Sequence, residues 1–211
     1  MRVRSLAKIG GCGLILLTGA GYAGYRHYWR PAPIIPPRER VADPVLRGAV
    51  AQLDHPASYD ASYVSLPYPG GDVPPEQGSC TDVVIRAMRN DGIDLQKLIH
   101  EDITAHPKRY PRVKKLDANI DHRRVPNQAI YFRTYGLSLP TQVNDSTLAT
   151  WHPGDVVQWK IGGRLDHTGI ISDRKNSRGV PLVIHNISRA AEDDVLQAWP
   201  IVAHFRYPKK R

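Results

Sequence analysis

Three apolar runs near the carboxyl end of the chain decide its fold: DVVQW (155–159), HTGIIS (167–172) and LVIHN (182–186). Each run is short and rich in β-branched residues, and polar or glycine-containing segments separate the runs, as in strands joined by turns. A fourth run, AHFRY (203–207), follows near the end of the chain. We therefore predict that this part of the chain forms a sheet.

A helix is predicted to begin at Ser79, directly after a loop rich in Gly and Pro (54–78). The Ser79 hydroxyl can cap the first turn, and Asp82 stands where the acidic partner of a capping box is found. Gly92 ends the helix. Cys80 therefore falls in the first turn of this helix.

Further helices are predicted from apolar spacing over 38–53, after a cap at Asp94, and around 126–135. These helices come first in the chain and the strands come afterwards. That order predicts an α+β fold with an antiparallel sheet.

The N-terminal segment indicates export. Residues 1–30 combine a basic start with 17 uncharged residues, as in a signal anchor or signal peptide. A Pro-rich linker (31–39), a folded domain (40–208) and a basic tail (209–211) follow. We expect a periplasmic or extracytoplasmic domain, tethered to the inner membrane by this segment or secreted if the segment is cleaved.

The charge distribution argues against nucleic-acid binding. The chain has 29 basic and 20 acidic side chains, a net charge of +9. Eight of the basic side chains lie in residues 1–30 and 209–211, which leaves the body between them almost neutral. A nucleic-acid surface needs a basic stripe on the folded domain, so we expect no such partner. Nothing in the sequence indicates an oligomeric state.

Cys80 has two interpretations. A helix N-terminus offers free N–H groups and a partial positive charge, which lower a thiol pKa and can hold an oxyanion. This interpretation makes Cys80 a nucleophile. In the other interpretation Cys80 is a small buried apolar residue, as free cysteines often are. The second cysteine, Cys12, lies in the N-terminal apolar stretch, so no disulfide framework is expected.

Two histidines are candidates for the base that a thiol nucleophile needs. His167 begins one predicted strand, and His185 lies near the end of the next. If the two strands form a hairpin, these positions are neighbours, and His185 can orient His167. Taken singly, His167 is equally a surface histidine at a strand end, and His185 a satisfied core histidine.

These residues carry a resemblance to the NlpC-type cell-wall peptidases. WHPGDVVQW (151–159), HTGIIS and VIH (183–185) resemble the C-terminal half of that family, which has a papain-like fold. GSCTDVVIRA (78–87) is similar to its nucleophile helix. More closely, the chain resembles an exported, uncharacterised bacterial family within that superfamily, through YPGGD (68–72), GSCTDVVIRAMR (78–89), GIDLQKLIHED (92–102), NIDHRRVPN (119–127) and IHN (184–186).

The resemblance implies a cysteine hydrolase that cleaves an amide bond in peptidoglycan or muropeptides without a cofactor. It implies Cys80 as nucleophile, His167 as base and His185 as the orienting residue. Two positions depart from the family pattern. Ser79 stands where an Asp is usual before the Cys, and the upstream Tyr of the oxyanion region is matched by Tyr68. The alternatives are a non-catalytic cell-wall binding module, and a transpeptidase or acyltransferase.

The polar run from Asn119 to Arg124 is a candidate for substrate binding. Arg123 and Arg124 can hold a substrate carboxylate, because guanidinium groups bind carboxylates in a bidentate manner. The alternative is a solvated loop with internal salt bridges. The candidate substrate-binding residues are Tyr68, Asp82, Asp121, His122, Arg123 and Arg124.

A metal site is not expected. His100, Glu101, Asp102 and His106 lie close together in the sequence, but they lack the HExxH or paired-Cys spacing of metal ligands. We therefore expect neither a metal nor another cofactor.

Overall fold

The computed structural model describes residues 41–209. Helices come first and an antiparallel sheet follows, so the α+β prediction is confirmed. None of the helices in the described range combines the length and the apolar character that a membrane crossing requires. The predicted anchor (1–30) and linker (31–39) lie outside the described residues.

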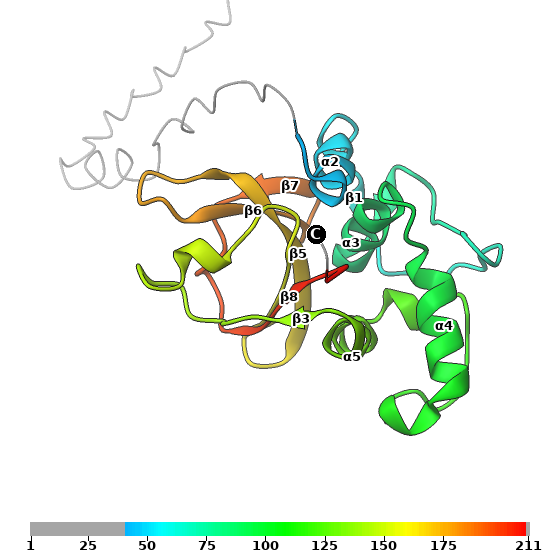
Figure 1. Ribbon diagram of the computed structural model, residues 1–211. Helices are drawn as coiled ribbons and strands as arrows, with labels where there is room; N and C mark the ends of the chain where they lie inside the picture. Colours follow the sequence, from blue (N-terminus) through cyan, green and yellow to red (C-terminus); the bar gives the residue numbers. More distant parts are fainter. Residues whose placement is uncertain (1–40, 210–211) are drawn as a thin grey trace, which may run out of the picture. The chain divides into compact units, whose positions relative to one another are not determined.

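The main sheet has six strands in the order β3-β8-β4-β5-β6-β7, and every neighbouring pair is antiparallel. Figure 1 shows that the sheet curls strongly. All four predicted strands are present, β5 is longer than predicted, and β3 and β7 were not predicted. The strands are β3 (Leu137–Ser138), β4 (Val156–Ile161), β5 (Leu165–Lys175), β6 (Pro181–Asn186), β7 (Ala190–Asp193) and β8 (Ile201–Arg206).

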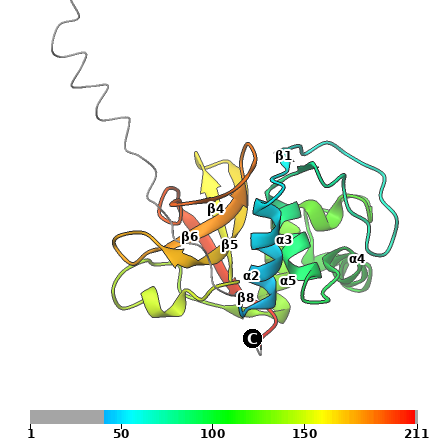
Figure 2. The ribbon, with the colours of Figure 1, turned by 90° about the horizontal axis from the view of Figure 1, so that it is seen from above.

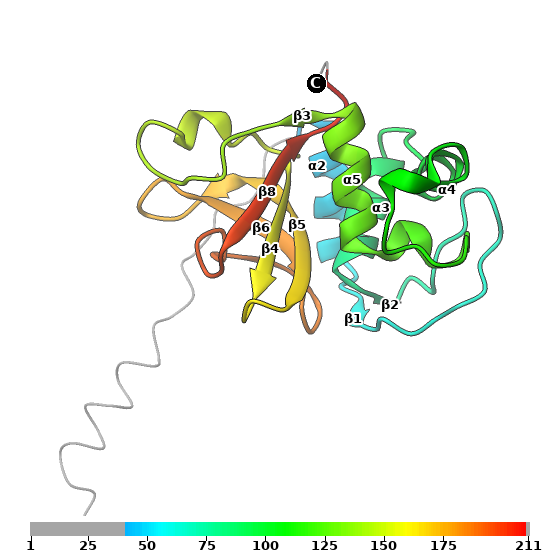
Figure 3. The same cartoon turned by 90° about the horizontal axis from the view of Figure 1, so that it is seen from below.

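The helices lie on one side of this sheet, as Figures 2 and 3 show. They are α2 (Pro44–Val50), α3 (Cys80–Arg89), α4 (Leu95–Ala105) and α5 (Val125–Tyr135). Helices α2, α3 and α5 contact the sheet, while α4 packs against α3 and α5. Short 3₁₀ turns are η1 (Ala51–Leu53), η2 (Pro107–Arg109), η3 (Asp121–Arg123) and η4 (Leu148–Thr150).

Local caps set the helix starts. The helix predicted from residue 38 begins only at Pro44, because Asp43 caps it through the Leu46 N–H and Pro44 suits the first helical position. Asp94 caps α4 as predicted. Helix α3 has the predicted capping box: the Asp82 carboxylate accepts the Ser79 backbone N–H at 2.6 Å.

Side-chain alternation gives the sheet two buried faces. Ile170 and Ile184 pack in the apolar cluster formed with the helices. Their neighbours Ile171 and Val183 belong to a second cluster, which contains Trp159 and lies on the opposite face. In the paired parts of β5 and β6, even-numbered side chains therefore face the helices, and odd-numbered side chains face the second cluster.

Gly169 permits the close approach of β5 and β6. It is paired with His185, and a Cβ at position 169 would lie 2.7 Å from Val183 Cγ1 and 2.9 Å from the Ile184 carbonyl oxygen. A backbone carbonyl within a sheet cannot move aside without breaking the ladder, so a larger side chain here separates the strands.

Gly169→Ala is expected to lower the free energy of unfolding by about 1–3 kcal/mol, as overpacking does in a close-packed core. Urea unfolding followed by circular dichroism measures this change. An unchanged midpoint would show that β5 and β6 tolerate a methyl group between them.

Candidate functional site

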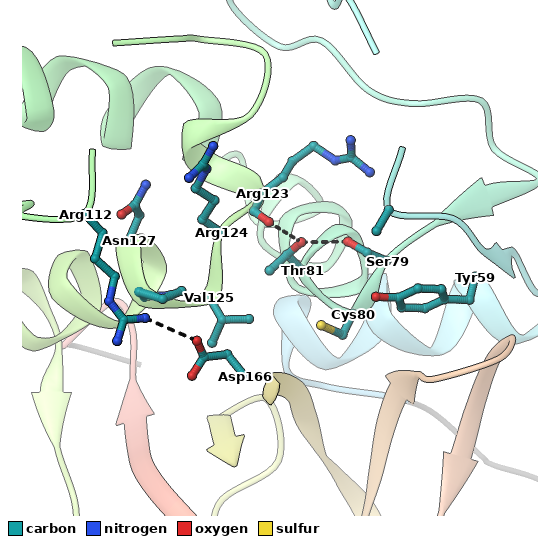
Figure 4. Close-up of a pocket in the computed structure, with 12 residues that line it drawn as sticks. Tyr59, Ser79, Cys80, Thr81, Arg112, Arg123, Arg124, Val125, Asn127 and Asp166 are labelled. Carbon is teal, nitrogen blue, oxygen red and sulfur yellow. Dashed lines mark hydrogen bonds and ion pairs between the residues drawn. The ribbon is translucent and has the colours of Figure 1, made fainter. Parts of the chain in front are cut away.

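Cys80 lines a pocket of about 310 Å³ at the start of α3. Figure 4 shows its sulfur with Tyr59 on one side and Val125 and Asp166 on the other. Tyr59 comes from β1 (Ser58–Tyr59), which pairs in parallel with β2 (Gln77–Gly78), directly upstream of the helix. The start of α5 and the start of β5 complete the wall, so the thiol lies where helices and sheet meet.

The thiol is protonated at neutral pH. Burial raises the pKa of Cys80 to about 11, and the Asp82 carboxylate also raises it. Hydrogen bonds from the backbone N–H groups of Thr168, Thr81 and Cys80 act in the opposite direction. The prediction that the helix start lowers this thiol pKa is therefore wrong, because desolvation outweighs the N–H groups.

His167 and His185 are brought together as the hairpin argument predicted. His167 Nε2 lies 2.8 Å from His185 Nδ1, and His185 Nε2 lies 3.2 Å from an Asp193 carboxylate oxygen. Asp193, on β7, completes this hydrogen-bonded series and was not predicted from the sequence. It lies in an acidic run of three residues (192–194), a pattern that is typical of a solvated turn.

The carboxylate at one end of this hydrogen-bonded series sets the direction of both hydrogen bonds. The Asp193 carboxylate can only accept, so His185 donates from Nε2 and keeps a lone pair on Nδ1. His167 must then donate from Nε2 to that lone pair. Its other nitrogen, Nδ1, is left as a proton acceptor, and no hydrogen bond within residues 41–209 occupies it.

Both imidazoles are buried among tryptophans. The His167 ring stacks on Trp159 at 5.7 Å between centroids and meets the edge of Trp199. Burial, together with a smaller effect of His185, lowers the pKa of His167 to about 4. Burial also lowers the pKa of His185, against the opposing effect of Asp193. Both rings are therefore neutral at pH 7.

The histidines and α3 lie on opposite faces of the sheet. His167 and His185 share the face of Ile171 and Val183, because side chains alternate along a strand. Within the described residues, no hydrogen bond joins either ring to Cys80. The thiol instead meets β5 through the backbone N–H of Thr168, the residue after His167.

Arg123 is committed to an internal ion pair. Its Nε and an Nη each lie 2.9 Å from the Asp82 carboxylate, and both side chains are about 97% buried. The same guanidinium donates to the carbonyls of Ser62 and Asp60. Figure 4 shows it pointing away from Cys80. The guanidinium of Arg123 and the carboxylate of Asp82 are thus already paired with each other, an arrangement that the prediction of substrate binding did not include.

Arg124 fits the predicted role better, because it is exposed and lines the Cys80 pocket. Its neighbours Asp121 and His122 are buried outside that pocket. Asp121 accepts the Asp117 backbone N–H, and burial lowers the pKa of His122 to about 4. These two residues support the turn that presents Arg124.

Tyr59, and not Tyr68, is the tyrosine beside the thiol. Tyr68 does not line the Cys80 pocket, and its ring packs edge-on against His100. Tyr59 lines the pocket, and the pKa of its phenol is raised by burial and by Cys80. The pairing of β1 with β2 brings Tyr59 to the pocket. Two-residue strands separated by a long loop leave no recognisable pattern in the sequence, so this pairing was not predicted.

No group of three or more His, Cys, Asp or Glu side chains within residues 41–209 is arranged to hold a metal ion. In the segment considered for a metal, Asp102 instead accepts hydrogen bonds from Tyr110, Tyr135 and Arg109 and lies 2.9 Å from the His106 ring. That cluster joins α4 to α5.

A family model described as "Domain of unknown function (DUF1287)" matches residues 46–207. The chain belongs to the DUF1287 family. It is 48% identical over 164 residues to a protein named "Uncharacterized protein YijF" from Escherichia coli (strain K12), a match that covers 76% of this chain and 78% of that protein. No solved structure matches the chain. The match spans Cys80, both histidines and Asp193, so the whole candidate site lies inside the DUF1287 domain.

The raised thiol pKa predicts slow alkylation at neutral pH. The thiolate is the reacting form, so the rate with iodoacetamide is expected to climb about tenfold per pH unit above pH 8. The folded pKa also exceeds the unfolded value of about 8.5. Stability from this group is therefore complete below that pH and is lost as pH rises toward 11.

The rate is measured by quenching the alkylation at set times and counting modified protein by mass spectrometry. The variant Cys12→Ala leaves Cys80 as the sole thiol. Cys80→Ala is expected to remove the alkaline loss of stability. A rate that reaches its plateau by pH 7 would contradict the neutral thiol.

Proposed function

We propose that this DUF1287 domain is a cysteine hydrolase with a papain-like, NlpC-type arrangement, and that it cleaves an amide bond in peptidoglycan. The observation that carries the proposal is the chain Asp193–His185–His167, which leaves His167 Nδ1 as a proton acceptor. The next residue along the strand, Thr168, contacts the Cys80 sulfur through its backbone. The proposed base, His167, and the proposed nucleophile, Cys80, thus lie on opposite faces of the same short segment of β5.

In the proposed reaction, the thiol proton passes through water to His167 Nδ1, because the two groups lie on opposite faces of the sheet, as Cys80 Sγ attacks the amide carbonyl carbon. The carbonyl oxygen becomes an oxyanion, held by N–H groups at the start of α3. When the C–N bond breaks, His167 returns the proton to the leaving amine. Water, deprotonated by His167, then attacks the thioester and releases the acid and the thiol.

A neutral thiol and a neutral imidazole suit this order of events. Two charges made in advance would both have to be desolvated in a site this buried. Proton transfer that accompanies the attack creates the thiolate only when the substrate carbonyl can receive its charge. His185 acts as a positioning residue, since it fixes the tautomer of His167 without touching the substrate.

The choice of peptidoglycan is supported by three features. The N-terminal segment predicts export, and the residue pattern resembles that of cell-wall peptidases. Arg124 adds an exposed cation beside Cys80, and cell-wall stem peptides are rich in carboxylates.

A cell-wall binding module on the same fold is the second candidate. It is favoured by the buried, protonated thiol, for which no hydrogen bond to an imidazole is present within residues 41–209. In that case the thiol is a packing residue, and turnover is absent.

Cys80→Ala is expected to abolish release of new amine groups from purified peptidoglycan, because the nucleophile is lost. Cys12→Ala, which removes the other cysteine, is the matched control and should retain activity. Mass spectrometry of the wild type, quenched with acid during turnover, should detect the mass of an acyl group bound to Cys80 as a thioester. Binding of peptidoglycan without amine release by the wild type would favour the binding module.

His185 variants separate positioning from packing. His185→Asn keeps an acceptor close to the place of Nδ1, so it should still hold the His167 tautomer and retain activity within about tenfold of wild type. His185→Leu fills similar space without an acceptor, and kcat should fall by about 10²-fold or more, in the range expected for a general base. Equal activity of the two variants, measured as amine release at several pH values, would remove His185 from the mechanism.

A further inference from the structure

The pocket at Cys80 continues into a second pocket of about 280 Å³. The 3.4 Å contact between Arg112 and Asp166, drawn in Figure 4, lies where the two meet. Both pockets are lined by Arg112, Val125, Pro126, Asn127 and Asp166. One cleft therefore runs from the thiol along the start of α5 to strand β4.

The far part of this cleft is cationic. Arg112, Arg133 and Lys160 line it, opposed by the Asp166 carboxylate. Arg112 and Lys160 both pair with Asp166. Arg133 has no carboxylate partner within residues 41–209, and its guanidinium carbon lies 6.0 Å from the centre of the Phe205 ring. Three cations thus face one carboxylate, and Arg133 is the one of the three without a carboxylate partner in the described part of the chain.

Gln158 supplies an independent sign of a missing ligand. It lines the same pocket and is 2% exposed, yet its buried Nε2 has no hydrogen-bond partner within the described residues. A buried donor without a partner destabilises the folded chain, and a ligand that accepts its hydrogen bond removes that cost. Gln158 is paired with Thr168 across β4 and β5, so this donor lies one strand away from the backbone that contacts Cys80.

We propose that the second pocket is a subsite for a carboxylate carried by the substrate. Gln158 Nε2 donates a hydrogen bond to one oxygen, and Arg133 supplies the opposing charge. One amide donor and one guanidinium without a carboxylate partner within residues 41–209 suit the two oxygens of a carboxylate. This inference rests on the proposed hydrolase for calling the ligand a substrate, while the binding itself does not depend on turnover.

The test is direct binding to the full chain carrying Cys80→Ala, which removes the thiol and leaves the second pocket intact. Acetyl-glutamate methylamide, acetyl-glutamine methylamide and inorganic phosphate are titrated in turn, with affinities measured by NMR. The glutamate probe is expected to bind at least tenfold more tightly than the glutamine probe. Weaker binding of the glutamate probe than of phosphate would overturn the assignment to a carboxylate.

Three variants locate the binding. Arg133→Gln and Gln158→Leu should each weaken the glutamate probe at least fivefold, whereas Arg164→Gln, an exposed control that lines neither pocket, should have no effect. Gln158→Leu should leave the unfolding temperature unchanged or raised, because the amide has no partner to lose. A lowered unfolding temperature with unchanged affinity would make Gln158 a structural residue and overturn the proposal.

The outcome is separable from that of the hydrolase test. If Cys80→Ala still releases amines from peptidoglycan but prefers the glutamate probe, the proposed mechanism fails and the subsite stands. If amine release depends on Cys80 but the two peptide probes bind equally, the mechanism stands and the subsite is refuted.

Discussion

The Asp82 carboxylate holds together the segments that surround the thiol. It accepts the Ser79 backbone N–H at the start of α3 and forms a bidentate pair with Arg123. Arg123 in turn binds the loop after β1 through the carbonyls of Asp60 and Ser62. Removing one partner of such a buried pair typically costs about 3–5 kcal/mol. The position of Cys80 depends on this network, because Ser79 and Asp82 lie within two residues of it at the start of α3.

Burial also determines the protonation states of Cys80 and the two histidines. Cys80, His167 and His185 are all within 6% of complete burial. Desolvation disfavours the charged form of each group, which raises the thiol pKa and lowers both imidazole pKa values. None of these three side chains is charged at rest, and the charged pairs beside the thiol, such as Asp82–Arg123, are made by other residues. In the proposed hydrolase, charge on the reacting groups therefore forms only when a substrate binds.

The cleft beyond the thiol has a different character. Cations line both pockets, Arg124 beside the thiol and Arg133 beyond it, but in the described part of the chain the buried amide without a partner, Gln158 Nε2, lines only the second pocket. The proposed subsite would hold the charge of a ligand carboxylate in the second pocket, apart from the Cys80 sulfur.

Features that depend on near neighbours in the chain could be predicted from the amino-acid sequence alone. The capping box of Ser79 and Asp82, the four strands and the meeting of His167 with His185 follow from spacings of a few residues or from one hairpin, and each was predicted. Asp193, Tyr59 and the pairing of Arg123 with Asp82 depend on segments that are remote in the chain or weakly patterned. Only the tertiary structure decided these. It also reversed the expected thiol pKa, because burial is a property of the packed molecule and no local pattern encodes its extent.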